Sequence, residues 1–436
     1  MEIIVIGGGA AGMMAAYSAA AEGARVTILE KNDRPGKKIY ITGKGRCNVT
    51  NACGREEFFT HVFRNPRFLY SSFGRFSNED MYRFVEAHGT PLKVERGQRV
   101  FPVSDHASDV IKALKKALDE AGVKTVLGAK AEKLQLKGGA VTGVVCAVTD
   151  AEGKPKRQIF PADRVIVATG GLSYPGTGST GDGYRFAEEA GHRVTPREPS
   201  LVPLNARFEK PLSDRFSPKS LMGLSLKNVG IRVEQGGKKI TEDFGEMMFT
   251  HFGVTGPLIL SASALLGDAL KEETVSAKGP VRLHLDLKPA LSEEQLEARF
   301  LRESAGNGAK QLDTFLGGWL PKALIPVVLG QAGTDAAQKT GTVKKEQRDA
   351  LIRALRDLKL VITGLRGYEE AVVTRGGVDV KEIDPKTMAS KKVRGLYFAG
   401  EVLDLDGTTG GFNLQIAWST GYAAGKGAAA ADKKEE

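Results

Sequence analysis

The chain has 436 residues, a formal net charge of +10, 41% hydrophobic and 26% charged residues, a composition typical of a globular protein with about two or three domains. Its three cysteines form no CxxC pair, and no apolar run has the length of a membrane span, which argues against a disulfide framework, a cysteine-based metal site and a membrane protein. The N-terminus enters a strand-like run directly, without a signal-peptide pattern. We therefore expect a reduced, cytoplasmic protein with no metal ion and no membrane partner.

A glycine motif, GGGAAG, lies between the apolar run EIIVI and an Ala-rich segment that predicts a helix over 10–22. In a dinucleotide-binding βαβ unit, Gly7 makes the tight turn out of the strand and Gly9 lets the backbone approach a pyrophosphate. Gly12 then lets helix and strand pack closely. The free N–H groups and positive dipole end of the helix favour phosphate, so this segment predicts a nucleotide site.

An acidic residue, Glu30, ends the next predicted strand, 25–29, after a helix stop at Gly23. A carboxylate at this position accepts hydrogen bonds from ribose hydroxyls and disfavours a 2′-phosphate. The segment therefore predicts an adenosine-containing nucleotide such as FAD or NAD.

Two later segments resemble the other contacts that an FAD-binding enzyme draws from distant parts of its chain. Strand-like residues 163–168 lead into Thr169 and Gly170, and strand-like residues 395–400 lead into Glu401. The second is followed by glycines at the start of a predicted helix, 413–431, whose N–H groups suit the negative charge of a reduced flavin. Each junction alone is an ordinary strand–turn–helix, but three in this order predict FAD.

The remaining pattern predicts an interrupted α/β fold. Helices are expected around 79–88 and 107–121, and a hairpin-like pair of strands at 140–149 and 158–161. Short strand-like runs fill 200–290, whereas 292–360 is helical in pattern, with Ser292 as an N-cap. We predict a Rossmann-like FAD-binding domain formed by 1–194 with 362–436, an inserted β-rich domain at 195–290 and an inserted helical domain at 291–361.

A second GxGxxG pattern runs from Gly176 to Gly181. Residues 172–175 separate it from the preceding strand, so the tight turn of a Rossmann start is missing. We therefore expect no second dinucleotide site, and NAD(P)H would reach the flavin without a dedicated domain.

The motifs GGGAAG, GKGRCNVTN, ATGGLSYPGTGSTGDG, THFGVTGP, TRGGVD and YFAGEVLDLDGTTGGFNLQ together resemble the BaiN/RdsA family of bacterial flavoproteins over residues 1–427. The resemblance implies a two-dinucleotide-binding FAD fold, with a barrel-like and helical insertion between its halves. It implies FAD contacts at Gly7, Gly9, Ala11, Gly12, Glu30, Lys31, Gly45, Arg46, Cys47, Thr169, Gly170, Gly400, Glu401, Gly411, Asn413 and Leu414.

Three side chains are candidate proton donors beside the flavin. Cys47 lies in the Gly- and Lys-rich loop, and its alternative role is that of a small buried packing residue. His251 opens a Gly-rich loop of the insertion, where a packed structural role is the alternative, and Tyr174 follows the strand-like segment 163–168. The other histidines have no supporting context, and neither metal-ligand spacing nor a nucleophile elbow is present.

Three activities fit the resemblance. The first is reduction of uridine to dihydrouridine in large-subunit rRNA, with NAD(P)H as electron donor, hydride passing from flavin N5 to C6 and a proton to C5. The second is reduction of an enone of the 3-dehydro-bile-acid type, and the third is oxidation of an aminoacetone-type amine. A non-enzymatic FAD-binding RNA scaffold is a further alternative.

The positive charge of the chain favours RNA as a partner. Three local basic clusters are equally typical of solvated surfaces: Lys37, Lys38, Lys44 and Arg46; Lys344, Lys345, Arg348, Arg353 and Arg356; Lys391, Lys392 and Arg394.

Overall fold

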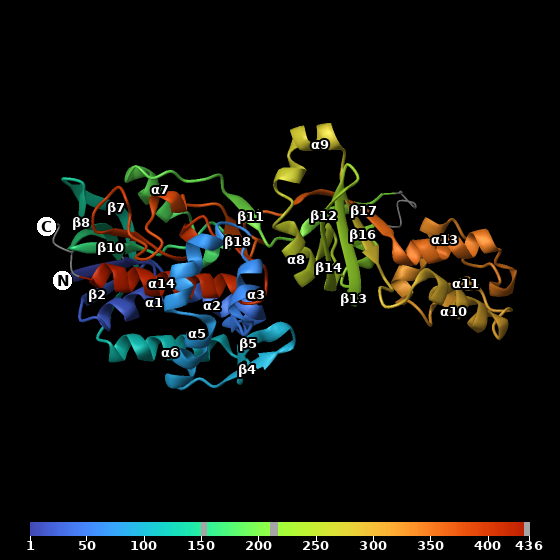
Figure 1. Cartoon of the computed structure of the whole chain (residues 1–436), viewed down its shortest axis with the longest axis horizontal. Helices are drawn as coiled ribbons and strands as arrows, with labels where there is room; N and C mark the ends of the chain where they lie inside the picture. The colour runs from blue at the N-terminus through green and yellow to red at the C-terminus, as the bar shows by residue number, and fades with distance from the viewer. Residues whose placement is uncertain (150–154, 210–216, 431–436) are drawn as a thin grey trace. The chain divides into compact units, whose positions relative to one another are not determined.

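The computed structural model describes residues 1–149, 155–209 and 217–430. Two compact units divide the chain: Met1–Pro199 with Tyr368–Glu436, here named the sheet unit, and Ser200–Gly367, here named the barrel unit. Figure 1 labels many of their helices and strands. The predicted turn at 150–154 lies outside the described residues.

The sheet unit is built on five parallel strands in the order β19-β10-β1-β2-β6. Its central strands are runs of Ile and Val that are almost fully buried, as parallel strands covered on both faces require. The strand bounds are β1 Glu2–Ile6, β2 Arg25–Glu30, β6 Lys124–Leu127, β10 Arg164–Val167 and β19 Leu396–Phe398.

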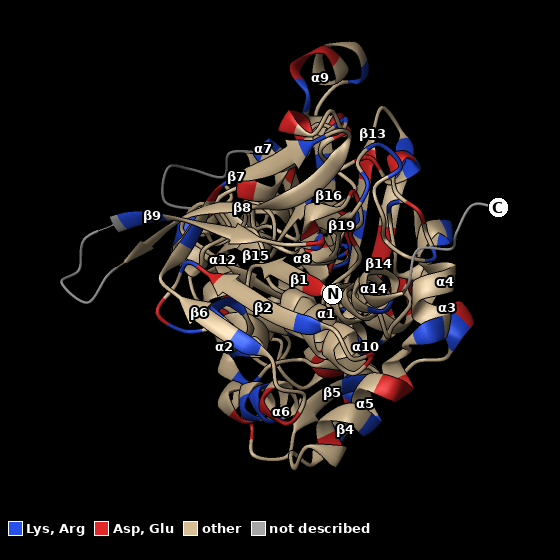
Figure 2. Cartoon of the chain, turned by 90° about the vertical axis from the view of Figure 1, so that its left-hand side faces the viewer, with Lys and Arg blue, Asp and Glu red and all other residues tan. Residues whose placement is uncertain are grey.

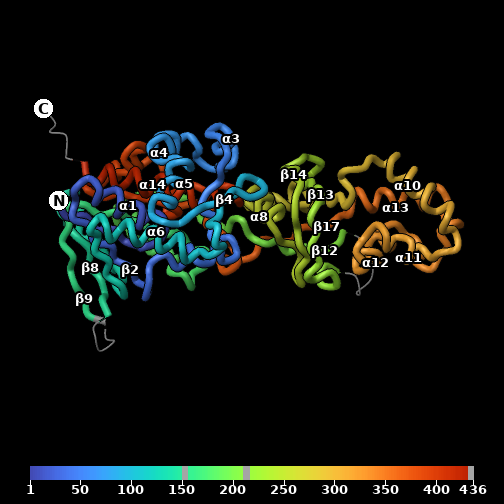
Figure 3. The backbone as a smooth tube through the Cα atoms, turned by 90° about the horizontal axis from the view of Figure 1, so that it is seen from below, coloured from blue at the N-terminus to red at the C-terminus, as the bar shows by residue number. Residues whose placement is uncertain are grey.

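Two helices, α1 (Ala10–Ala20) and α14 (Phe412–Ala429), lie side by side along this sheet, as Figures 1 and 3 show. They come from opposite ends of the chain and pack backbone to backbone. A Cβ on Gly425 would lie 2.0 Å from Ser18 Oγ, and one on Gly421 would lie 2.4 Å from the Ala11 carbonyl oxygen. Small residues along α14 therefore bring the C-terminal segment onto the first βαβ unit.

Smaller elements surround this core of the sheet unit. Three short sheets pair β7 Ala129–Lys137, β8 Ala140–Thr149 and β9 Pro155–Pro161; β3 Thr50–Asn51, β5 Arg99–Pro102 and β4 Leu92–Glu95; and β11 Glu198–Ser200 with β18 Val373–Arg375. The helices are α2 Lys37–Ile41, α3 Arg55–Thr60, α4 Tyr70–Arg75, α5 Asn78–Ala87, α6 Ala107–Glu120 and α7 Asp182–Glu189.

The barrel unit contains a closed barrel in the order β12-β15-β14-β13-β16-β17. It also contains helices, most of which share the hydrophobic cluster of the barrel. The strands are β12 Leu204–Phe208, β13 Ser225–Gln235, β14 Lys238–Phe249, β15 Gly253–Thr255, β16 Val281–Asp286 and β17 Leu358–Leu365. The helices are α8 Pro257–Ser263, α9 Glu272–Lys278, α10 Glu293–Ala305, α11 Leu312–Leu316, α12 Ile325–Ala332 and α13 Lys345–Arg356.

The predicted fold class, a Rossmann-like α/β domain with a barrel-like and helical insertion, is confirmed. The Ser292 cap is observed, because its hydroxyl accepts from the Gln295 N–H while the Gln295 side chain accepts from the Ser292 N–H. One element departs from the expectation. Strand β17 runs across the predicted boundary at 361/362 and closes the barrel by pairing with β12 and β16. Barrel and helices consequently form one unit rather than the two inserted segments drawn from the sequence.

Candidate functional site

The carboxyl ends of four parallel strands meet at one edge of the sheet. In the observed register Ile6 lies beside Leu29 on one side and Val167 on the other, and Val167 lies beside Phe398. The residues that follow these strands therefore share this edge, and ligands of open α/β sheets bind at such an edge. They include the predicted cofactor contacts Gly7, Thr169, Gly170 and Gly400, and the predicted contact Glu30 is itself the last residue of β2.

Two glycines of the first motif hold strand and helix in direct contact. Gly7 has a φ of +102°, and a Cβ on it would lie 2.5 Å from the Ala168 carbonyl oxygen. A Cβ on Gly12 would lie only 1.8 Å from the Gly7 carbonyl oxygen. No side chain fits at either position, so the glycines are required by the protein's own packing.

Gly9 differs from these two glycines. It is the N-cap of α1, and no atom of the described residues lies within 4 Å of the position that its Cβ would take. The start of α1 thus presents open space beside the N–H groups of the first turn, which is where an anion is stabilised by a helix N-terminus. Ala11, in that turn, is buried.

The Glu30 carboxylate is buried and fixed by three N–H donors. It accepts from the Gly8 N–H at 2.7 Å, and from the backbone and side-chain amides of Asn32 at 2.8 and 2.7 Å. Glu30 therefore ties the first glycine turn to the segment after β2.

Lys31, the next residue, reaches the start of α7. Its ammonium lies 2.7 Å from the Asp182 carboxylate and donates to the Thr180 hydroxyl at 2.6 Å. Burial opposes ionisation of Asp182, but the hydrogen bond and charge of Lys31 outweigh it, so the pKa of Asp182 is lowered. Lys31 thus ties the ends of β2 and α7 together.

The second predicted piece, Thr169-Gly170, follows β10. Gly170 has a φ of +73°, and a Cβ there would lie 2.8 Å from Ser179 Oγ. The Thr169 hydroxyl is buried and has no hydrogen-bond partner among the described residues. Since a buried hydroxyl without a partner is costly, this orphaned group fits a site that a polar ligand completes.

The third predicted piece joins β19 to α14. Gly400, at φ +78°, lies against the first turn of α1, because a Cβ on it would be 2.6 Å from the Ala11 side chain. Gly411, the N-cap of α14, lies against Thr50, whose carbonyl would be 2.4 Å from a Cβ. Asn413 uses its side chain within this loop, bonding the backbone of 407–408, and Leu414 packs against the core.

The Gly- and Lys-rich loop bends sharply, with positive φ at Gly43, Lys44, Gly45 and Cys47. Arg46 stacks on the Phe101 ring at 4.0 Å and pairs with Glu95 and Asp105, at 2.5 and 2.9 Å. Its guanidinium is therefore engaged by β4 and by the loop after β5.

Cys47 is fully buried, with 0% of its surface exposed. Burial raises the pKa of its thiol to about 12, against a smaller opposing effect of a hydrogen bond with Thr42. A proton donor must touch its substrate, so this burial favours the packing role that the sequence left open.

The other two proton-donor candidates lie in different units. Tyr174, in the sheet unit, is partly exposed and left-handed at φ +51°, and its N–H donates to the Tyr368 carbonyl. Burial, and secondarily Glu370, raises the pKa of its hydroxyl. His251 is exposed in the barrel unit, between β14 and β15, and packs edge-on against Phe252.

The model of a protein family described as "HI0933-like protein Rossmann domain" matches residues 1–427 of the chain. The chain belongs to this family. It is 34% identical to the 3-dehydro-bile acid delta(4,6)-reductase of Clostridium scindens, over 98% of this chain and 99% of that protein. It is also 34% identical to a ribosomal RNA dihydrouridine synthase of Escherichia coli, over 97% of this chain and 96% of that protein.

Among solved structures, the chain resembles the 3-ketosteroid delta1-dehydrogenase of Sterolibacterium denitrificans, with a TM-score of 0.51 and 16% identity, covering 98% of this chain and 99% of that chain. This likeness shows the shared fold. Family membership confirms the predicted family and the predicted class of enzyme, an FAD-dependent oxidoreductase.

The geometry of this HI0933-like chain fits FAD on several grounds. Open space lies at Gly9, a buried hydroxyl is orphaned at Thr169, and the buried Asn48 side-chain oxygen has no partner among the described residues. All three belong to segments predicted to surround the cofactor. In the described ranges, no cluster of three or more potential metal ligands occurs, and no helix has the length and hydropathy to cross a bilayer.

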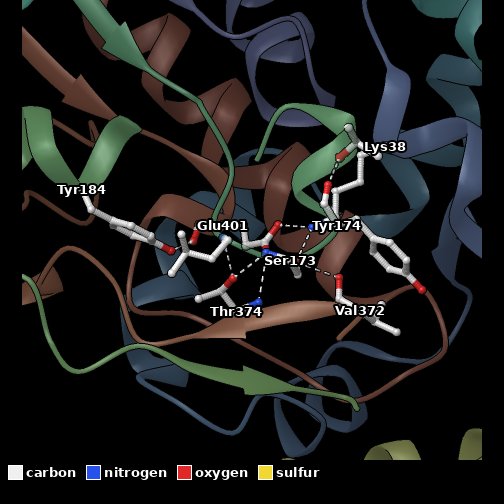
Figure 4. Close-up of polar contacts among 9 residues, drawn as sticks. Lys38, Ser173, Tyr174, Tyr184, Val372, Thr374 and Glu401 are labelled. Carbon is white, nitrogen blue, oxygen red and sulfur yellow. Dashed lines mark hydrogen bonds and ion pairs between the residues drawn. The ribbon is translucent and has the colours of Figure 1, made fainter. Parts of the chain in front are cut away.

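Sequence reasoning missed several side chains at this edge. Lys38, Ser173 and Thr374 surround the Glu401 carboxylate, as Figure 4 shows. Ser173 and Thr374 lie within the motifs ATGGLSYPGTGSTGDG and TRGGVD, and Lys38 within a basic cluster, but a motif does not say which side chains touch.

His192, which had no supporting context in the sequence, lies between two polar partners. Its Nδ1 is 3.1 Å from the Glu382 carboxylate and its Nε2 is 2.7 Å from the Ser390 hydroxyl. The order resembles a hydrolytic triad, but the His192 side chain is fully buried and Ser390 Oγ also accepts the N–H groups of Lys392 and Val393. Ser390 is therefore committed to its own turn rather than available as a nucleophile.

Proposed function

We propose that this chain reduces the C5=C6 bond of a uridine in large-subunit rRNA, giving dihydrouridine, with FAD as cofactor and NAD(P)H as electron donor. One observation carries the cofactor part of this proposal. Three segments distant in sequence bring Gly7, Gly9, Thr169 and Gly400 to one edge of a parallel sheet, beside the N-terminus of α1.

The proposed contacts divide between the ends of the cofactor. We assign the adenosine to the end of β2, the pyrophosphate to the first turn of α1, and the flavin to the loop around 43–48 and the start of α14. When bound, FAD supplies the hydride for the reduction. The residues proposed to hold it, directly or through neighbouring side chains, are Gly7, Gly9, Ala11, Gly12, Glu30, Lys31, Gly45, Arg46, Cys47, Thr169, Gly170, Gly400, Glu401, Gly411, Asn413 and Leu414.

The protein's own contribution is positioning and a proton. Among the three candidates, Tyr174 combines partial exposure with a hydroxyl whose pKa is raised by burial, so it holds its proton at neutral pH. The thiol of Cys47, by contrast, is enclosed. We propose Tyr174 as the residue that donates the proton.

The net charge of the whole chain, +10, supports an RNA substrate, because a positively charged protein attracts polyanions. Within the sheet unit, Figure 2 shows Lys and Arg scattered over α2, α3, α5 and α6 with acidic residues among them. Several members of the predicted basic clusters form ion pairs: Lys38 with Glu401, Arg46 with Glu95, Arg348 with Glu297, Arg356 with Asp286 and Lys392 with Glu382. Exposed cations such as Lys44, Lys345 and Arg353 remain as the proposed phosphate contacts. The proposed substrate implies a cytoplasmic protein.

A second candidate function is reduction of an enone in a bile-acid-like steroid. The chain is as similar to the Clostridium scindens reductase as to the Escherichia coli synthase, at 34% identity to each over nearly full length. A bile acid is a largely apolar steroid with one carboxylate, whereas RNA carries a charge at every phosphate, so the two candidates differ in the salt dependence expected for substrate binding.

Nucleoside mass spectrometry of 23S rRNA from cells with and without the gene tests the proposal. We expect one dihydrouridine to disappear on deletion and to return when the intact gene, but not its Gly9→Val version, is restored. Unchanged rRNA would overturn the rRNA substrate. Reduction of a 3-dehydro-bile acid by the purified holoenzyme would then support the second candidate.

A further inference from the structure

The Glu401 carboxylate joins four segments of the sheet unit. It follows Gly400 after β19, at the edge where the strands end, and Gly400 lies against Ala11 in the first turn of α1. Its partner Lys38 lies in α2, at a sequence separation of 363 residues, while Ser173 follows β10 and Thr374 belongs to β18. Glu401 thus lies within the edge proposed to hold FAD.

Both carboxylate oxygens of Glu401 have close donors within the protein (Figure 4). Oε2 is 2.7 Å from the Lys38 ammonium, and Oε1 accepts from the Ser173 hydroxyl at 2.8 Å and from the Thr374 N–H at 2.9 Å. Three such donors, one of them charged, satisfy most of the capacity of a carboxylate.

The Ser173 hydroxyl makes this arrangement directional. Lys38 donates to Ser173 Oγ at 2.7 Å, so the single hydroxyl hydrogen is free to point elsewhere. The Glu401 oxygen, at 2.8 Å, is closer and more negative than the Val372 carbonyl, at 3.2 Å. The hydrogen therefore points to Glu401 and closes a triangle of Lys38, Ser173 and Glu401.

The pair is partly withdrawn from water, with side-chain exposures of 22% for Lys38 and 18% for Glu401. Removing one member of such a pair leaves an uncompensated charge, which costs more than removing both. Neighbouring Lys37 lacks this setting, since its partner Asp33 is 75% exposed and lies 3.2 Å away.

We propose that Lys38 and Glu401 are a positioning pair for the cofactor. Glu401 acts through Lys38, Ser173 and Thr374, shaping the edge and keeping it electrically neutral, rather than by bonding directly to FAD. The inference rests on the proposed function, because it presumes that this edge holds FAD.

The test uses full-length Lys38→Met, Glu401→Gln and the double variant, with Lys37→Met as the matched control. FAD affinity is measured on reconstituted apoprotein, and the midpoint potential of the bound flavin by redox titration. Each single variant is expected to weaken FAD affinity about tenfold, and the double variant to recover most of that loss.

The potential is the decisive readout, since negative charge near a flavin disfavours its reduced form. Lys38→Met, which leaves Glu401 uncompensated, is expected to lower the potential. Glu401→Gln is expected to raise it, and the double variant and Lys37→Met to match the wild type. Shifts of the same sign, or a double variant that binds FAD no better than Glu401→Gln, would overturn the inference and indicate a direct ligand or a general disruption.

Failure of the cofactor assignment can be distinguished from failure of the positioning pair. A wild-type protein that binds no FAD contradicts the proposed function, whereas normal FAD binding by wild type and Lys38→Met alike contradicts only the pair. If a charge variant does not fold, Ser173→Ala removes a corner of the triangle and keeps both charges. We expect it to weaken FAD affinity about threefold without changing the potential, and unchanged affinity would overturn the inference.

Discussion

Two segments of this chain carry the same GxGxxG pattern, and the structure uses them differently. In the first, Gly7 directly follows β1 and Gly12 lies within α1, and their backbones touch. In the second, β10 has already ended at Val167, and Gly176 lies in a short 3-10 turn, where its Cβ position has no described atom within 4 Å. Glycine spacing alone is therefore uninformative; contact between a strand end and a helix start distinguishes a nucleotide turn.

Adding a side chain where strand and helix touch is the strongest test of the difference between the two glycine motifs. Gly12→Val would place a Cβ 1.8 Å from the Gly7 carbonyl oxygen, and we expect it to destabilise the sheet unit by about 3 kcal/mol or more. Gly176→Ala, the matched control, should change stability by less than about 1 kcal/mol. Urea unfolding of both variants provides the measurement, and equal stabilities would contradict the distinction.

Gly9 separates packing from ligand binding within the first motif. Because its Cβ position is open, Gly9→Val should lower the apoprotein's unfolding free energy by only about 1 kcal/mol, the cost of a poorer N-cap for α1. The side chain would fill the space assigned to the pyrophosphate, weakening FAD affinity by about a hundredfold. Equilibrium titration with FAD checks this, and a variant that retains full affinity would move the pyrophosphate elsewhere.

Cys47 extends the comparison to the loop around 43–48. Its burial and a thiol pKa of about 12 favour packing, so Cys47→Ala should keep FAD and turnover and lose about 1–2 kcal/mol of stability. Absorbance, steady-state rates and thermal unfolding measure the three quantities. Retained flavin with abolished turnover would instead make Cys47 the proton donor.

The smallest expected effect concerns His192, away from both glycine motifs. Burial lowers its pKa, despite the opposing charge of Glu382, so the folded protein favours the neutral ring. The unfolded state then binds more protons, and stability is lost as pH falls from near 6.5 through the lowered pKa. His192→Gln should reduce this pH dependence by about 1 kcal/mol or less. Unfolding curves at pH 8 and pH 5.5 test it; an unchanged dependence would exclude His192 as a cause.

Much of the fold was predictable because local signals agreed with it. Gly7 and Gly12 mark a contact between adjacent elements, and Ser292 caps a helix with a partner three residues away. Strand β17 was missed because it follows a strong helical pattern, and only pairing with β12 and β16 decides its state. Residue spacing does not encode such long-range pairing.

The residues of the candidate site also fall into two groups: those that the local sequence predicts and those that only long-range contacts determine. Backbone positions such as Gly400 and Gly411 follow from strand–turn–helix junctions, whose geometry is local. The Lys38–Glu401 pair joins residues 363 positions apart, and nothing in either local sequence names the other as partner. Cys47 similarly lies in a conspicuous motif, yet its burial depends on the whole core.

The carboxyl edge of the five-stranded sheet is the proposed binding site of FAD. The most direct measurement is a titration of full-length apoprotein with FAD, followed by visible absorbance and by the stoichiometry of bound flavin, with Gly9→Val beside the wild type. We predict one FAD per chain for the wild type and a loss of affinity in the variant. Wild-type protein that remains colourless after reconstitution would contradict FAD binding at this edge of the sheet.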